Sequence, residues 1–177
     1  FTYSPDLQTD ITISNNSFHN GDVNDNNSGG YAAIVVYQDP SEEDNHNVKI
    51  INNDIKDWGR YGIVMEDVSG IEVSHNEIYN KLNYADGFRE GISHFGNNGG
   101  SGFERSVMSY NYIHDLCRAT YTGTVYGIYW RGYYAPNDFD IVNNVIVLES
   151  LGSLYGVFMY GRFSGGAPYG VQTVEYN

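Results

Sequence analysis

The chain has one cysteine, four prolines and nine lysine or arginine residues among its 177 residues. Cys117 has no partner for an internal disulfide, so cysteine content does not indicate a cellular compartment. The 22 acidic residues leave a net charge of −13, which argues against nucleic acid as a partner, because phosphate binding depends on clustered cations. No run approaches about 18 apolar residues, so we expect neither a transmembrane helix nor a membrane partner.

Residues that form strands and cores are abundant, by contrast. Apolar residues make up 41% of the chain and aromatic residues 15%, which allows a substantial core and argues against disorder. Ile, Val, Tyr, Phe and Thr dominate the repeating stretches, whereas helix formers are scarce. The 21 glycines supply many turns. A chain of this length corresponds to about one domain.

An asparagine recurs along the chain with apolar residues at fixed positions around it. An aliphatic residue or Met stands three places before it, and in five of the six instances an apolar residue stands two places after it. Successive asparagines are separated by 23 to 37 residues. They are Asn16, Asn53, Asn76, Asn111, Asn144 and Asn177. Self-similarity at this spacing indicates a repeat architecture.

A second motif lies between the asparagines, where a small residue is followed by Ile or Val. The instances are Ala33-Ile34, Gly62-Ile63, Gly91-Ile92, Gly127-Ile128 and Gly156-Val157. Side chains alternate along a strand, so we expect the residue after each small residue, and the residue two places later, to point into the core.

The two interleaved patterns predict an all-β fold, a right-handed parallel β-helix of about five turns with an asparagine ladder. One predicted core column is Ile13, Ile50, Val73, Met108 and Ile141, and the other is Ile34, Ile63, Ile92, Ile128 and Val157. An antiparallel β-sandwich is the alternative, but its turn spacing of about 8–12 residues fits poorly. Because the chain ends within a repeat, we interpret residues 1–177 as one domain cut from a longer β-helix protein.

We expect the asparagines to be structural. The change of phase between the apolar positions on either side implies a bend at the asparagine, a residue that tolerates left-handed backbone geometry. Asparagines stacked about 4.8 Å apart on neighbouring strands can also bond one another through their side-chain amides.

The segment Asn111-Tyr112-Ile113-His114-Asp115, followed by Tyr126-Gly127-Ile128-Tyr129, shows the repeat in full. It resembles the repeats of the pectate-lyase-like superfamily, and in particular those of its bacterial carbohydrate-active members. The resemblance covers about residues 11–177 and implies the parallel β-helix fold. The superfamily includes lyases, hydrolases, epimerases, tailspikes and adhesins. The Gly-His-Gly and Asn-Thr-Asp motifs of polygalacturonase-like hydrolases and the Asp-Pro-His motif of mannuronan epimerases are absent.

Alternation also predicts an outer face for the second strand of each turn. Residues two places before, two places after and four places after the small residue are expected to point outward. These predicted columns are Tyr31, Arg60, Arg89, Val125 and Leu154; Val35, Val64, Ser93, Tyr129 and Phe158; and Tyr37, Glu66, Phe95, Arg131 and Tyr160.

The mixture of aromatic side chains and arginines on this face is typical of sugar recognition. Aromatic rings stack on the C–H faces of sugars, and arginine holds a carboxylate or sulfate with two parallel bonds. The alternative is a solvated or loop-covered sheet whose arginines pair with Glu66 and Glu90. On the first interpretation, the substrate-binding residues are Tyr37, Arg60, Arg89, Phe95, Tyr129 and Tyr160.

A catalytic version of this site would use Arg131, His94, Glu66 and Glu90. Arg131 would stabilise developing negative charge, and His94 would act as the base. Glu66 and Glu90, on adjacent turns, would form the pair of carboxylates that glycoside hydrolysis requires. The competing interpretation of His94 is a buried core residue.

These residues favour a secreted module, outside the cell or at its surface, that binds a polysaccharide and cleaves or modifies it as a lyase or glycosidase. The alternative is a non-catalytic segment of an adhesin, tailspike or extracellular filament, stacked end to end with another β-helix chain. No cofactor is indicated with certainty. The acidic cluster of Asp39, Glu42, Glu43 and Asp44 would suit Ca²⁺, but a solvated loop is the favoured interpretation.

Overall fold

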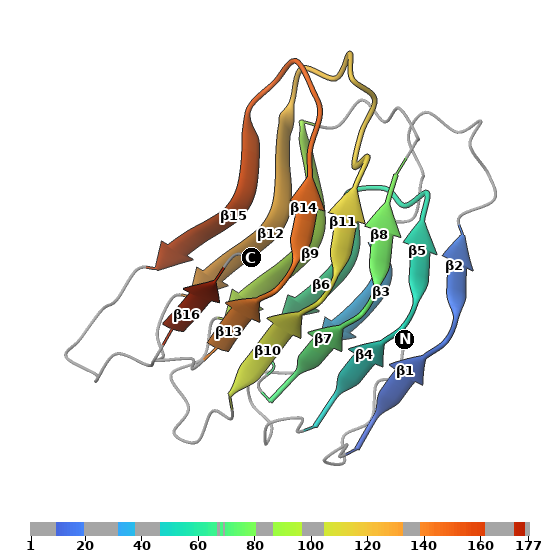
Figure 1. Cartoon of the computed structure of the whole chain (residues 1–177), viewed down its shortest axis with the longest axis vertical. Helices are drawn as coiled ribbons and strands as arrows, with labels where there is room; N and C mark the ends of the chain where they lie inside the picture. Colours follow the sequence, from blue (N-terminus) through green and yellow to red (C-terminus); the bar gives the residue numbers. More distant parts are fainter. Residues whose placement is uncertain are drawn as a thin grey trace.

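The chain forms a solenoid of parallel strands in the computed structural model (Figure 1). The structure describes residues 10–19, 32–37, 47–66, 68, 70–80, 87–96, 105–132, 139–161 and 172–175. These ranges contain strands, turns and no helix. The predicted all-β parallel β-helix is therefore confirmed.

Three parallel sheets make up the solenoid. The first sheet contains β1 (Thr12–Ser14), β4 (Lys49–Ile51), β7 (Glu72–Ser74), β10 (Ser106–Ser109), β13 (Phe139–Val142) and β16 (Gln172–Glu175). The second contains β2 (Ser17–His19), β5 (Asp54–Lys56), β8 (Glu77–Tyr79), β11 (Tyr112–His114) and β14 (Val145–Val147). The third contains β3 (Ala32–Tyr37), β6 (Tyr61–Glu66), β9 (Phe88–Gly96), β12 (Thr124–Gly132) and β15 (Leu154–Gly161).

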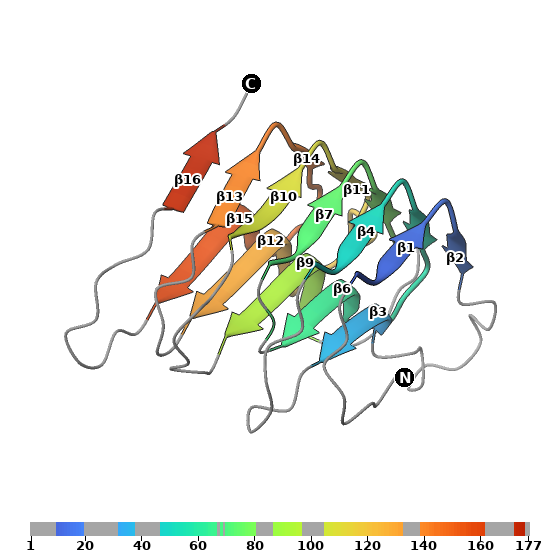
Figure 2. The same cartoon turned by 90° about the horizontal axis from the view of Figure 1, so that it is seen from below.

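Along the chain, consecutive strands pass from the first sheet to the second and then to the third before the next coil begins. The described strands give the coils β1–β3, β4–β6, β7–β9, β10–β12 and β13–β15, and β16 pairs with β13. Figure 2 shows the first and third sheets as separate rows, with each strand beside its counterpart in the next coil.

Strand register places inward side chains of the same kind in line. The row in the first sheet is Ile13, Ile50, Val73, Met108 and Ile141, and the row in the third is Ile34, Ile63, Ile92, Ile128 and Val157. The second sheet adds Phe18, Ile55, Ile78, Ile113 and Ile146. The three central members of each row are 0–2% exposed. Both predicted core columns are therefore confirmed, and the core consists of stacked aliphatic side chains.

The corner between the first and second sheets has left-handed backbone geometry, but not at the residue we expected. At this corner, the residue before each repeat asparagine has a positive φ angle of 56–58°. These corner residues are Asn15, Asn52, His75, Tyr110 and Asn143. The repeat asparagines therefore do not make the bend themselves, and their side chains are directed along the stack by the residue that precedes them.

Each repeat asparagine bonds its counterparts in the neighbouring coils. From Asn16 to Asn144, the main-chain N–H and the Nδ2 group of one asparagine donate to the Oδ1 atom of the next, at 2.9–3.2 Å. Nδ2 also donates to the main-chain carbonyl three places before the previous asparagine, at 2.8–2.9 Å. Asn53, Asn76 and Asn111 are 1–2% exposed. Water therefore cannot replace these bonds at the central coils.

Replacing Asn76 or Asn111 with Ala is expected to lower the free energy of unfolding by about 1–3 kcal/mol, because buried main-chain groups lose their partners. Urea denaturation followed by circular dichroism measures the change. Asn16→Ala is the matched control, since Asn16 is exposed and its loss should cost less. If Asn76→Ala unfolds at the same urea concentration as the wild type, the asparagine row does not stabilise the fold.

Candidate functional site

The candidate site lies on the outer face of the third sheet, whose shape depends on a column of glycines. A Cβ atom on Gly62 or Gly91 would lie 2.8 Å from the Cγ2 atom of a buried isoleucine of the second sheet, Ile78 or Ile113 respectively. One on Gly127 would lie 2.5 Å from the Cγ2 atom of the partly buried Ile146 in the same sheet. The missing side chain therefore faces inward. The next residue in each strand is also buried. Two consecutive residues face the core, so the strand bends and the alternation changes phase at the glycine.

This change of phase makes one predicted outer column wrong at two of its positions, whereas Arg60 of that column is partly exposed and Leu154 is exposed, as expected. Arg89 and Val125, two places before their glycines, are fully buried. The Arg89 guanidinium lies 5.3 Å from the ring of Tyr121, and its Nη1 group donates to the Phe88 carbonyl at 3.0 Å. Arg89 therefore does not lie on the outer face as expected. Tyr31, predicted in the same column, lies outside the described residues.

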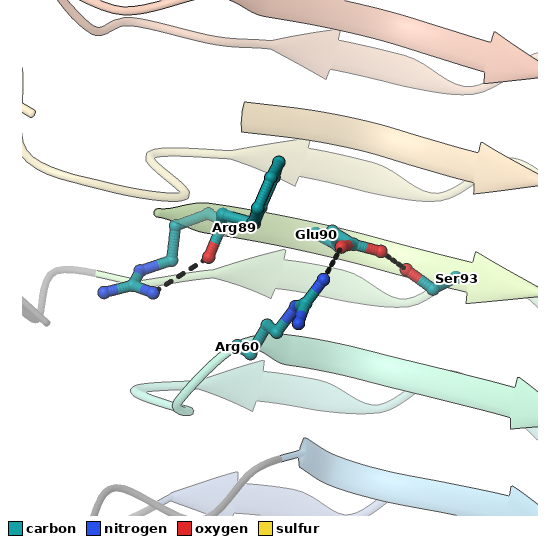
Figure 3. Close-up of polar contacts among 5 residues, drawn as sticks. Arg60, Arg89, Glu90 and Ser93 are labelled. Carbon is teal, nitrogen blue, oxygen red and sulfur yellow. Dashed lines mark hydrogen bonds and ion pairs between the residues drawn. The ribbon is translucent and has the colours of Figure 1, made fainter. Parts of the chain in front are cut away.

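The residue directly before each glycine faces outward instead, and in β9 this residue is Glu90. Its Oε2 atom accepts a hydrogen bond from the Ser93 hydroxyl at 2.5 Å, and its Oε1 atom accepts one from Arg60 Nη2 at 3.2 Å. Figure 3 shows both groups approaching the Glu90 carboxylate, while Arg89 points away from it. The Arg60 guanidinium also lies 4.9 Å from the ring of Tyr61 and 5.2 Å from that of Phe88.

Glu90 is an unusual carboxylate because its side chain is 3% exposed although its strand position faces outward. Burial raises the pKa of Glu90, and the Ser93 hydrogen bond and the Arg60 charge offset part of that rise. Burial is also the main cause that raises the pKa values of Tyr126 and Tyr129, and the Glu90 charge adds to it. Both tyrosines therefore keep their protons at neutral pH and remain hydrogen-bond donors.

Aromatic rings on this face stack on one another across the coils. Tyr126 stacks on Tyr155 with centroids 5.1 Å apart, and Tyr129 stacks on Phe158 at 5.6 Å, with planes 15° and 5° apart respectively. Rings of the preceding coil lie on their other sides, Phe88 at 6.4 Å from Tyr126 and Phe95 at 5.7 Å from Tyr129, so both faces of each tyrosine have aromatic neighbours. The expected stacking of a sugar on the face of Tyr129 is not supported by this arrangement, and ring edges and hydroxyl groups are the parts left for a ligand.

The column four places after the small residue forms one row across the sheet, as expected from alternation. Register places its members side by side in the order Tyr37, Glu66, Phe95, Arg131 and Tyr160. Tyr37 and Tyr160 are 50% and 46% exposed, and the three others are partly buried. We call these five residues the outer row. They bring a carboxylate, a guanidinium and two phenol hydroxyls together at the surface.

The two candidate catalytic carboxylates are not brought together. Glu66 pairs with Phe95, whereas Glu90 lies five residues earlier in β9 and pairs with Tyr61. Five residues of strand span about 16 Å. A pair acting on one glycosidic bond is separated by about 5–10 Å. The expected Glu66–Glu90 pair is therefore wrong.

His94 lies in the core, which agrees with its interpretation as a buried residue. It is 2% exposed and pairs in register with Met65 and Trp130. Its ring is parallel to that of Trp130 at 6.3 Å, and its Nε2 atom lies 3.0 Å from the Val68 carbonyl oxygen. A carbonyl accepts, so Nε2 carries the proton. His94 is therefore on the opposite side of the strand from the outer row.

Sequence reasoning missed Phe88, Tyr126 and Tyr155, which contribute rings to the outer face through mutual stacking. Regular alternation, applied through the glycine, assigns these positions to the wrong side. A glycine within a strand often marks a bend, and its recurrence in four coils was the available signal.

Metal binding has no support in the residues that the structure describes. They contain no group of three or more His, Cys, Asp or Glu side chains arranged to hold a metal ion. The acidic cluster proposed for Ca²⁺, Asp39 to Asp44, lies outside the described ranges. Likewise, none of the described segments forms a helix long and apolar enough to cross a membrane.

Three comparisons with known proteins add no relative. No protein-family model, no curated protein and no solved structure matches this chain. The parallel β-helix fold therefore rests on the structure, and the resemblance to the pectate-lyase-like superfamily stays an interpretation of the sequence.

Burial lowers the pKa of His94 from its ordinary value of 6.5, although the hydrogen bond to Val68 acts in the opposite direction. Below about pH 6.5, His94 therefore binds a proton more readily in the unfolded chain than in the native state, so the free energy of unfolding falls as the pH falls. His94→Gln keeps a neutral donor, so its melting temperature should drop less than that of the wild type between about pH 7 and about pH 5. Calorimetry measures both curves, with the exposed His19→Gln as control. Parallel curves for wild type and His94→Gln would contradict the prediction.

The raised pKa of Glu90 affects the pH dependence of stability in the opposite direction to that of His94. The native state binds a proton more readily than the unfolded chain, so the stabilisation is complete below the ordinary pKa of 4.5 and is lost as the pH rises through the native value. Glu90→Gln retains hydrogen-bonding groups but cannot ionise. Its stability relative to wild type should therefore increase from pH 4.5 toward neutrality, measured by urea denaturation. Glu149→Gln, an exposed carboxylate, controls for the loss of one charge. A constant difference across this range would refute the prediction.

Proposed function

We propose that this β-helix binds a polysaccharide along the outer face of its third sheet. The observation that carries the proposal is the outer row, in which five coils each present one side chain at the same strand position. Neighbouring strands are about 4.8 Å apart, which is close to the length of one sugar unit in an extended polysaccharide. A glycan lying across the strands would therefore contact one coil with each sugar unit.

The chemistry of the outer row suits hydroxyl and carboxylate groups. Tyr37 and Tyr160 are half-exposed and offer phenol hydroxyls that both donate and accept. Arg131 stands between Phe95 and Tyr160, and a guanidinium holds a carboxylate or sulfate with two parallel bonds. We therefore favour an acidic polysaccharide, bound through hydrogen bonds and one ion pair.

A catalytic form of this proposal assigns two roles to the same face. Arg131 would neutralise a uronate carboxylate or stabilise the negative charge that develops in the reaction. Tyr129, which keeps its proton, would donate it to the leaving oxygen in place of His94. In a lyase, the Glu66 carboxylate of the same row would accept the proton removed from the carbon beside the uronate carboxylate, and the double bond would form as the C–O bond breaks. In a hydrolase, water would lose a proton to that carboxylate and add to the sugar carbon that the leaving oxygen departs from. A lyase would release products with an ultraviolet-absorbing double bond, and a hydrolase would release reducing ends alone, so the two assays separate the reactions.

The second candidate is a non-catalytic segment of an extracellular fibre, adhesin or tailspike. It is favoured by four outward residues of β6 and β9, which are 0–2% exposed and therefore covered. These are Tyr61, Val64, Glu90 and Ser93. On this alternative, the stacked rings and the Arg60–Glu90–Ser93 network stabilise the sheet, and the coils would stack end to end with another chain. Sedimentation as discrete oligomers or filaments, without glycan binding, would support it.

Replacing Arg131 with Ala is expected to weaken binding of an acidic polysaccharide by about tenfold or more, because hydrogen bonds to charged groups contribute about 1.5–3 kcal/mol. Isothermal titration calorimetry with uronate-containing and neutral polysaccharides measures the affinities. Arg118→Ala removes the same charge at an exposed position between β11 and β12 and is the matched control. Equal losses of affinity in both variants would indicate attraction by overall charge rather than a site at Arg131. If the wild type bound no polysaccharide, the non-catalytic segment would be the remaining candidate.

A further inference from the structure

The corner residues between the first and second sheets depart from their own pattern in two adjacent coils. Three of them are asparagines, Asn15, Asn52 and Asn143, and the other two are His75 and Tyr110. All five have φ angles of 56–58°. Asn suits this geometry because its short amide bonds locally, and His adopts it more often than most residues, whereas the bulky ring of Tyr has no such compensation. Tyr110 is therefore the costliest residue in the column.

Packing against the core does not explain these two rings. Both side chains are exposed, and that of Tyr110 is 55% exposed. The rings stack with centroids 5.0 Å apart and planes 4° apart. Tyr112, two residues further on, is 43% exposed and stacks on His114 at 4.1 Å. We call His75, Tyr110 and Tyr112 the corner ridge. An unfavourable backbone geometry that presents aromatic rings to solvent is a feature found at binding sites.

The groups around the corner ridge indicate the kind of ligand. Asn52 and Asn143 occupy the same corner position in the coils on either side, so an amide flanks the stacked pair at each end. Amides donate to and accept from hydroxyl groups, and aromatic rings contact the C–H faces of sugar rings. None of these side chains is a lysine or arginine, unlike the outer row, and the exposed carboxylate of Glu77 lies beside Tyr112 in register, which disfavours an anionic sugar. This combination suits an uncharged sugar.

We propose that the corner ridge is a second glycan-binding site, specific for a neutral sugar. It lies where the first sheet meets the second, and it shares no residue with the outer row of the third sheet. The site would hold a pyranose ring against the face of Tyr110 that His75 does not cover, with its hydroxyl groups bonded to the flanking amides. It does not depend on the function proposed for the third sheet, because the ligand class and the residues differ.

The test uses the residue that the other corners already contain. The double variant His75→Asn, Tyr110→Asn should fold with a melting temperature at or above that of the wild type, because Asn suits the left-handed geometry. The main-chain N–H bonds of both positions, to Ser109 and Val142, do not involve the side chains. Loss of binding in a folded protein of unchanged or higher stability separates a ligand site from a structural stack. Tyr110→Gly, which also suits this geometry, serves as the second variant.

Native gels containing barley β-glucan, xylan or galactomannan measure binding as retardation. We expect at least one of them to retard the wild type, and both corner variants to migrate in that gel as they do without polysaccharide. Leu151→Asn, at an exposed position between β14 and β15 outside both proposed sites, should be retarded like the wild type. The corner variants should keep the binding of acidic polysaccharide that depends on Arg131. The proposal would be overturned if the corner variants were retarded as strongly as the wild type. It would also be overturned if none of the three polysaccharides retarded the wild type.

Discussion

The fold depends on contacts between equivalent residues of neighbouring coils. Main-chain hydrogen bonds hold each strand to its counterpart, and the inward rows place one aliphatic side chain on the next. The buried asparagines extend the same principle to a polar group, since each amide satisfies groups in the coils beside it. A coil alone could bury neither its aliphatic row nor its amide, so stability is shared between neighbours rather than held within one coil.

Glycine sets the shape of the third sheet within that stack. At Gly62, Gly91 and Gly127 a side chain would collide with an inward isoleucine and with the carbonyl of the next coil, so only hydrogen allows the strands to bend there. The bend turns the preceding residue outward. It is the reason that Glu90 meets Ser93 and Arg60 on one face, and that Arg89 is buried beside Tyr121. One backbone feature thus decides which titratable groups can meet a ligand.

The sequence predicted the fold well because the same pattern of residues recurs from coil to coil, so a single irregular position does not hide it. The core columns and the outer row at Tyr37 to Tyr160 needed only alternation counted from a residue that truly faces inward. The site was predicted less well, because alternation was carried backward through a glycine that breaks it. The Glu66–Glu90 pair failed for a related reason: two carboxylates on adjacent coils are neighbours only when their register matches, and these differ by five residues. A sequence repeat shows which residues occupy equivalent positions in successive coils. A binding site depends instead on which individual side chains come together.

Departures from the columns are concentrated in two adjacent coils, β7–β9 and β10–β12. The core row carries His94 there, the column of outward aromatics carries Glu90, and the corner column carries His75 and Tyr110. β9 and β12 are also the longest described strands of the third sheet, at nine residues against eight for β15 and six for β3 and β6. His94, Glu90 and Tyr110 each have a local cost, in desolvation or in backbone geometry, that the residue common to their column would avoid. In a stack where every coil meets the same structural demands, such costs among the described residues of two coils favour the ligand contacts that we propose there, at the corner ridge and at Phe95 and Arg131 of the outer row.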